Sequence, residues 1–77
     1  MRFDEKDFIA ELRGNRRCLI EGVSGLLEYG DTAVAAELGK ATITIRGKRL
    51  RLSMMSEDRL GICGEIDSIT LEERNDK

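Results

Sequence analysis

The sequence predicts an all-β fold: a small antiparallel meander of six or seven short strands, curled or sandwich-like, preceded by one short N-terminal α-helix. Apolar and polar residues alternate from Arg17 onward, as they do in strands with one buried face. Glycines bound runs of strand length, and the chain has no proline that would stop a strand from pairing on both edges. The predicted strands are Cys18–Val23, Leu26–Tyr29, Thr32–Leu38, Ala41–Arg46, Arg49–Met54 and Leu60–Leu71.

The length of the chain sets its domain organisation. Its 77 residues suffice for one domain, expected over residues 1–77. Within that domain we expect the helix in residues 1–13, the β-meander in 17–72 and a flexible tail in 73–77.

The helix is predicted over Asp4–Arg13 from its apolar spacing and its ends. Phe8, Ile9 and Leu12 stand at i, i+1 and i+4, the spacing of one helical face. An aspartate can cap the first turn, and Gly14 follows the last residue, as at many helix C-termini. About ten residues are marginal as an isolated helix, so the apolar face is expected to dock on the rest of the protein or on a partner.

A hairpin is predicted over Ala41–Met54, where Gly47 and Lys48 fit a two-residue type II′ turn. One of its faces is apolar and is expected to face the core: Ile43, Ile45, Leu50, Leu52 and Met54. The other face is expected to be exposed to solvent: Thr42, Thr44, Arg46, Arg49 and Arg51. The next strand should return antiparallel and bring Glu65 near Arg49.

The last strand changes phase along its length. Ile62 and Ile66 occupy even positions, whereas Ile69 and Leu71 occupy odd ones. A β-bulge near Asp67–Ser68 would restore the alternation and curl the sheet.

The composition argues against an enzyme. The chain has no histidine, which excludes Ser/His and Cys/His nucleophile pairs and His-based zinc sites within one chain. The segment Gly22–Gly25 lacks the spacing of a phosphate-binding loop and is predicted to be a kink between strands. We therefore predict no catalytic residue, no cofactor and no metal ligand.

Two cysteines, Cys18 and Cys63, are too few for a disulfide-scaffolded secreted protein. Cys63 is expected to be a packed or half-exposed thiol, because a strand supplies neither the helix N-terminus nor the cationic partner that a reactive thiol needs. With no signal peptide and no apolar run of about 18 residues, we expect a cytoplasmic protein with free thiols and no membrane insertion.

A basic block stands out against the net charge of −2. Arg46, Lys48, Arg49 and Arg51 are the candidate partner-binding residues of the predicted hairpin. Three interpretations are open: neutralisation by acids on the next strand, an acidic protein partner, and nucleic acid or lipid headgroups.

The order of these elements resembles the YabP/YqfC family of sporulation proteins. The resemblance covers residues 14–71, and its most specific part is Ile43-x-Ile-x-Gly-x-x-Leu-x-Leu52 followed by Ile62-x-Gly-x-Ile-x-Ser-Ile69. The Leu-Ile-Glu-Gly run ending at Gly22 and the Leu-Leu-Glu-Tyr run ending at Tyr29 look closer to the YqfC branch.

The resemblance implies a non-enzymatic protein with a structural or adaptor role in spore envelope (coat or cortex) assembly. Its location would be the mother-cell cytoplasm, peripheral to the outer forespore membrane, and a membrane-embedded sporulation protein is the implied partner. Strand edges also favour a homo-oligomer. The alternative is a small Sm-like or OB-like β-barrel that binds nucleic acid, because the hairpin is basic. Nucleic acid is the less favoured partner, since the hairpin has no aromatic residue on which bases could stack.

Overall fold

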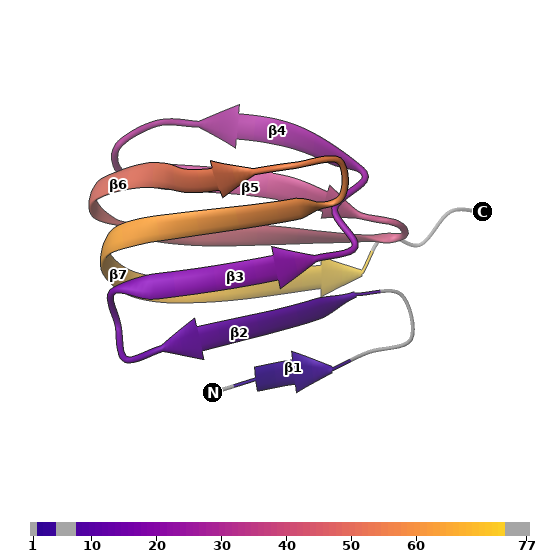
Figure 1. Ribbon diagram of the computed structural model, residues 1–77, viewed down its shortest axis with the longest axis horizontal. Coiled ribbons are helices and arrows are strands. Elements are labelled where there is room, and N and C mark those ends of the chain that lie inside the picture. Colours follow the sequence, from indigo (N-terminus) through magenta and orange to yellow (C-terminus); the bar gives the residue numbers. More distant parts are fainter. Residues whose placement is uncertain (1, 5–7, 74–77) are drawn as a thin grey trace.

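The computed structural model describes residues 2–4 and 8–73, and all regular structure in them is β-strand. Seven strands form one sheet in which each neighbouring pair is antiparallel (Figure 1). Their bounds are β1 Arg2–Asp4, β2 Ile9–Arg13, β3 Arg17–Glu21, β4 Gly25–Tyr29, β5 Ala33–Leu38, β6 Ala41–Met55 and β7 Arg59–Glu73. The all-β antiparallel fold predicted from the sequence is confirmed.

The strand order in the sheet is β1-β2-β3-β7-β6-β5-β4, so β7 returns to lie between β3 and β6. Among the described strands, β3 and β4 are the one pair that is consecutive in sequence but not adjacent in the sheet. The segment between them passes the β6–β7 turn, where the backbone N–H groups of Gly22 and Val23 both donate to the carbonyl oxygen of Asp58, at 2.9 Å. Gly22 has a φ of 95°, which confirms the predicted kink.

The predicted two-residue turn at Gly47 and Lys48 is wrong, because β6 continues through both residues and pairs with β7 along its length. A Cβ added at Gly47 would collide with the carbonyl oxygen of Glu65, and one added at Gly64 would lie 2.6 Å from the carbonyl oxygen of Arg49. The two glycines therefore permit a close approach of bulged strands. A glycine between two apolar runs is consistent with either a turn or a bulge, and here it forms a bulge.

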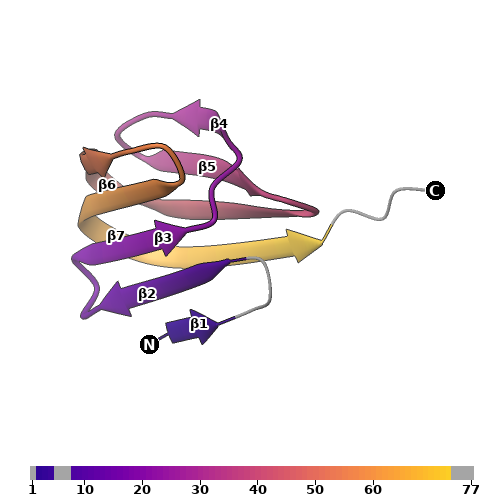
Figure 2. The ribbon, with the colours of Figure 1, turned by 45° about the vertical axis from the view of Figure 1, so that its right-hand side comes forward.

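Both long strands bend sharply at these bulges, and Figures 1 and 2 show them curling at the same end of the molecule. The bend folds the sheet into two layers. The front layer contains β2, β3, the first half of β7 and the second half of β6. The back layer contains β5, the first half of β6 and the second half of β7. The bend is held by Asp31 and Thr32, whose carbonyl oxygens accept from the N–H groups of Leu50 and Gly47 at 2.8 and 3.0 Å.

The predicted bulge near Asp67–Ser68 is confirmed. Arg46 pairs with Ser68 and Gly47 with Ile66, so Asp67 is the extra residue. The bulge restores the alternation across the change of phase, as the sequence indicated.

The hydrophobic core lies between the two layers, and among the described residues no polar or charged side chain is buried in it. Its largest fully buried side chains come from both layers: Ile20, Leu38, Ile43, Ile45, Leu60, Ile62 and Val34. On the predicted core face, Leu50 is also buried and Leu52 packs against the cluster, but Met54 is 38% exposed. The register shifts between Leu52 and Met54, so the strand changes phase before it reaches Met54.

The predicted N-terminal helix is not found in the described part of the chain. Ile9–Arg13 is strand β2, paired with β3, and Arg2–Asp4 is strand β1; residues 5–7 lie outside the described residues. The physical reason is an alternation with a period of two: Phe8 and Ala10 are buried and Leu12 packs against the core. Gly14, predicted as a helix terminus, has a φ of 60° in the β2–β3 turn.

The C-terminal boundary also differs slightly from the prediction. Glu73, assigned to the tail, is the last residue of β7. Residues 74–77 lie outside the described residues.

Candidate functional site

The outer face of the front layer carries a row of arginines that runs across four strands. The row consists of Arg13, Arg17, Cys63 and Arg51, on β2, β3, β7 and β6, and each residue is paired with the next. Their chain neighbours Cys18 and Ile62 are buried in the core. Because successive side chains point to opposite faces of a strand, the row faces away from the core. We call Arg13, Arg17 and Arg51 the arginine row.

A second row lies beside the first and contains a glycine. Glu11 pairs with Leu19, Leu19 with Gly61, and Gly61 with Met54. Gly61 has no side chain to cover the sheet, and a Cβ added there would lie 2.8 Å from Ser53 Oγ. Ser53 therefore covers Gly61, and an open hollow lies on the same face with Leu19 and Met54 in its lining.

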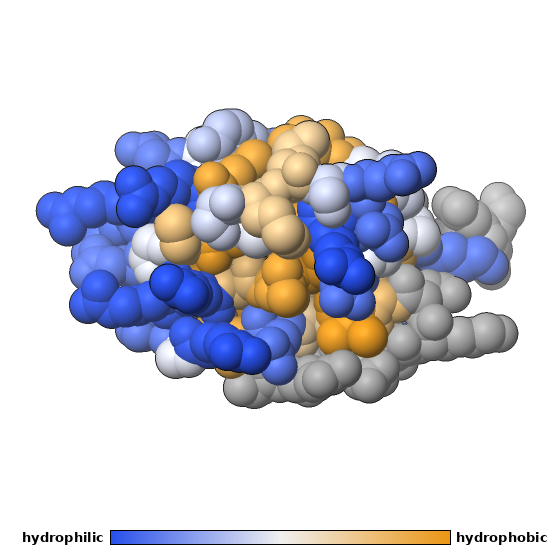
Figure 3. All heavy atoms as spheres, viewed as in Figure 1, coloured by the Kyte–Doolittle hydropathy of each residue, from blue (hydrophilic) through white to orange (hydrophobic). Residues whose placement is uncertain are grey.

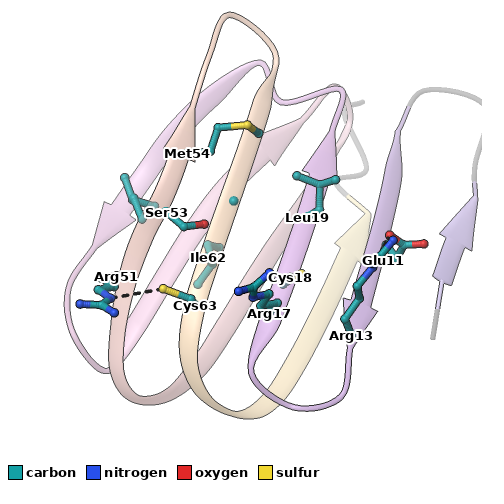
Figure 4. Close-up of a pocket in the computed structure, with 12 residues that line it drawn as sticks. Glu11, Arg13, Arg17, Cys18, Leu19, Arg51, Ser53, Met54, Ile62 and Cys63 are labelled. Carbon is teal, nitrogen blue, oxygen red and sulfur yellow. Dashed lines mark hydrogen bonds and ion pairs between the residues drawn. The ribbon is translucent and has the colours of Figure 1, made fainter.

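The hollow has a volume of about 740 Å³ and is lined by residues of both rows (Figure 4). Leu19 and Met54, each 38% exposed, form its apolar part. Figure 3 shows the same face as a central apolar band with hydrophilic atoms on either side. The hollow therefore combines cations with apolar surface.

Arg51 contacts the Cys63 thiol within the hollow. The Arg51 Nε donates a hydrogen bond of 3.3 Å to Cys63 Sγ, drawn as a dashed line in Figure 4. This hydrogen bond and the electrostatic interaction with Cys63 raise the pKa of Arg51. Cys63 is half-buried, as expected, but the expectation that it lacks a cationic partner is wrong, because strands bring partners from across the sheet.

Cys18 has a different environment from Cys63. Both thiols are free, and Cys18 is buried in the core, where desolvation raises the pKa of its thiol to about 11. Cys18 pairs with Ile62 and Arg17 with Cys63, so the two thiols point to opposite faces of the sheet. This arrangement rules out a disulfide between them within one chain.

The arginine row is only partly neutralised. In the described part of the chain, Arg13 Nε lies 3.3 Å from Glu11 Oε1, whereas no carboxylate pairs with Arg17 or Arg51. Both of these side chains are exposed. Cations placed opposite one another on adjacent strands repel, which favours an anion brought by another molecule.

The four candidate residues of the predicted hairpin are divided by the fold. Arg51 lies in the hollow, whereas Arg46, Lys48 and Arg49, which we call the bend cluster, lie at the bend. Arg49 has a φ of 54° there. The return of β7 is antiparallel as predicted, but Glu65 is paired with Lys48 rather than with Arg49. In the described residues the bend cluster makes no ion pair at 4 Å or less.

Arg13, Arg17 and Cys63 were not among the candidates from the sequence. The helix predicted over Asp4–Arg13 removed β2 from the sheet, so Arg13 had no cross-strand neighbours. The alternation of Phe8, Ala10 and Leu12 is the signal that would have placed it on β2.

The outermost strand β4 presents apolar side chains at the edge of the sheet. Leu27 and Tyr29 are 54% and 56% exposed, and Leu26 is 39% exposed. A register shift between Leu26 and Glu28 leaves Leu27 as a bulge. An apolar edge strand is a template for pairing with another chain.

Comparison with known proteins yields one match. A family model described as the YabP family matches residues 2–77, and the match does not separate the YqfC branch, which stays a prediction. No curated protein and no solved structure matches the chain. In the described residues, no helix is long and apolar enough to cross a lipid bilayer.

Proposed function

Since this chain belongs to the YabP family, which is associated with sporulation, we propose that it is a non-enzymatic structural or adaptor protein of spore envelope assembly. The observation that supports an adaptor most directly is the hollow, where unneutralised Arg17 and Arg51 adjoin exposed apolar side chains. Such a surface can hold another chain by charge and by burial of apolar area.

The proposed site of action is the mother-cell side of the outer forespore membrane, with a membrane-embedded sporulation protein as the partner. The arginine row suits the acidic parts of such a partner. The complementary charges would speed association and fix the orientation of the complex.

Self-association through the exposed edge is a second part of the proposal. The strand β4 offers backbone groups for pairing, and its Leu27 and Tyr29 side chains would be buried when a second copy pairs there. Light scattering at high micromolar concentration should show an oligomer. Leu27→Lys with Tyr29→Lys should give a monomer, because lysines on an edge strand oppose pairing. A monomeric wild-type protein would overturn this part.

Imaging in sporulating cells tests the location. A fluorescent fusion should form a shell around the forespore. A matched fusion carrying Arg17→Gln and Arg51→Gln should become diffuse if the hollow holds the partner. Diffuse signal from the wild-type fusion during sporulation would contradict the proposed location and adaptor role.

The alternative nucleic-acid-binding role gains little support. Phe8 is buried, and Tyr29 lies on the outermost strand β4, away from the strands that line the hollow. Neither of these two rings can therefore stack a base in the hollow. Fluorescence anisotropy with single-stranded RNA at about 50 mM salt tests it. Tight, salt-sensitive binding abolished by Arg49→Glu would favour this role.

A further inference from the structure

The two unpaired positive charges in the hollow can bind one or two anionic groups. Arg17 and Arg51 stand on either side of Cys63, two strand spacings apart, so their Cα atoms are separated by about 10 Å. Neither has a carboxylate partner in the described residues, and both are exposed. Two arginine side chains at this separation can converge on one carboxylate or hold two neighbouring ones.

The second row determines what must accompany the anion. Leu19 and Met54 lie one row away from Arg17 and Arg51, on either side of Gly61. The hollow can receive an apolar side chain, whose burial against Leu19 and Met54 would add to the binding free energy. A ligand that combines a carboxylate with a nearby apolar group therefore fits both rows.

Glu11 narrows the choice of ligand further. It lines the same hollow and lies 3.3 Å from Arg13, so this end of the site is neutralised and the unpaired positive charge is confined to Arg17 and Arg51. A long polyanion, such as a nucleic acid backbone, or a continuous anionic lipid surface would extend beyond these two cations onto the Glu11–Arg13 ion pair, which offers it no net attraction. A short peptide can end or turn neutral before reaching it.

We propose that the hollow binds a short acidic segment of a protein partner, in which one or two carboxylates contact Arg17 and Arg51 and a neighbouring apolar side chain packs against Leu19 and Met54. The inference rests on the proposed adaptor function and specifies the chemistry of its partner. The bend cluster takes no part in this contact.

Synthetic peptides test the recognition. The probes are fluorescein-labelled peptides that hold two glutamates and two leucines, in every order, between glycine ends. We expect at least one order to bind at about 50 mM salt, and we expect replacement of both glutamates by glutamine to weaken that binding about tenfold. Absence of binding by every acidic peptide at about 1 mM overturns the proposal.

Two double variants of equal charge locate the site. Arg17→Gln with Arg51→Gln should weaken peptide binding about tenfold, whereas Arg46→Gln with Lys48→Gln should change it less than about twofold. All four side chains are exposed, so both proteins should fold; circular dichroism checks this. Equal losses in the two variants would show attraction by overall charge and contradict the proposed site.

The Cys63 thiol provides an independent reporter. It lies in the hollow, whereas Cys18 is 2% exposed, so iodoacetamide should alkylate Cys63 first. A bound acidic peptide should slow this alkylation in the wild-type protein, and an unchanged rate at saturating peptide would place the peptide elsewhere.

Vesicles of phosphatidylcholine with phosphatidylglycerol test whether the hollow binds lipid headgroups instead of a peptide. Binding to these vesicles that depends on Arg17 and Arg51, without binding to any peptide, would replace the proposal with a lipid-headgroup surface. The peptide and imaging experiments fail separately. Correct localisation without peptide binding removes only the acidic segment, whereas peptide binding with diffuse signal removes the proposed function.

Discussion

The arginine row and the bend cluster are two basic regions that the fold constructs in different ways. The bend cluster is consecutive or nearly so in sequence, within residues 46–49 of one strand. The arginine row comes from three strands: Arg13 and Arg17 are paired across β2 and β3, and Arg51 of β6 joins them because β7 lies between β3 and β6. Only the row adjoins the hollow and its apolar side chains. Residues that are close in sequence identify a charged segment. A surface that combines charged and apolar side chains from several strands can be located only from the register of the sheet.

The bend keeps the two basic regions apart. Arg49 and Arg51 are only two residues apart, yet the bulges between Lys48 and Arg51 turn the strand so that Arg51 enters the front layer. The carbonyl groups of Asp31 and Thr32 hold this turn. The separation of the two basic regions thus depends on the geometry of the bend at Gly47.

Substitution of Gly47 should have the largest effect. In Gly47→Ala, the added Cβ would collide with the carbonyl oxygen of Glu65, and backbone atoms cannot yield as a flexible side chain does. We expect the free energy of unfolding to fall by about 3 kcal/mol or more, measured by urea denaturation.

Gly30→Ala is the matched control for this substitution. The nearest atom to its new Cβ is the carbonyl oxygen of Ala33 at 3.7 Å, an ordinary contact. We expect a change below about 1 kcal/mol. Equal stability of the Gly47→Ala and Gly30→Ala proteins would contradict the close approach of the strands at the bend.

Ionisation of the buried Cys18 thiol, on the inner side of β3, should have the next largest effect on stability. Burial raises the pKa of Cys18 from 9.0 to about 11, so the native state holds its proton more tightly than the unfolded state. This contribution to stability is fully present below pH 9 and is lost as the pH rises towards 11. The loss is on the order of 2–3 kcal/mol.

Urea denaturation between pH 8 and 11 measures this loss in the wild-type protein and in Cys18→Ala. The alanine variant is less stable at pH 8 because of the cavity it leaves, but it should lack the Cys18 part of the pH dependence. Identical pH profiles for the wild-type and Cys18→Ala proteins would mean that Cys18 is not shielded from solvent in the native state.

Much of the fold could be predicted from local patterns. The alternation placed Ile43, Ile45 and Leu50 in the core, and the change of phase between Ile66 and Ile69 located the bulge at Asp67. These inferences succeeded because burial of one strand face and the period of two leave few other arrangements.

The remaining errors arose where one local signal fits two structures. Gly47 suits a turn or a bulge, and Phe8, Ile9 and Leu12 suit a helix unless Ala10 is counted as apolar. Ala10 is 3% exposed, and its burial decides for a strand. The hollow could not be predicted, because it depends on β2 being in the sheet and on β7 pairing with β3, which lies 38 to 46 residues away in sequence.

Charge reversal should produce the smallest effects, with opposite signs in the two basic regions. Arg17→Glu places a carboxylate opposite Arg13 and removes a repulsion within the arginine row, so we expect a gain of a few tenths of a kcal/mol. In the bend cluster, Lys48→Glu places a carboxylate opposite Glu65 of β7, so we expect a loss of similar size.

The neutral variants Arg17→Gln and Lys48→Gln should have stabilities between those of the corresponding charge-reversal variant and the wild type. Urea denaturation at low salt measures the differences, and about 1 M salt should remove them, since the charges are exposed and screened. Shifts of the same sign in both regions would mean that overall charge, rather than the cross-strand register, sets the electrostatics of this sheet.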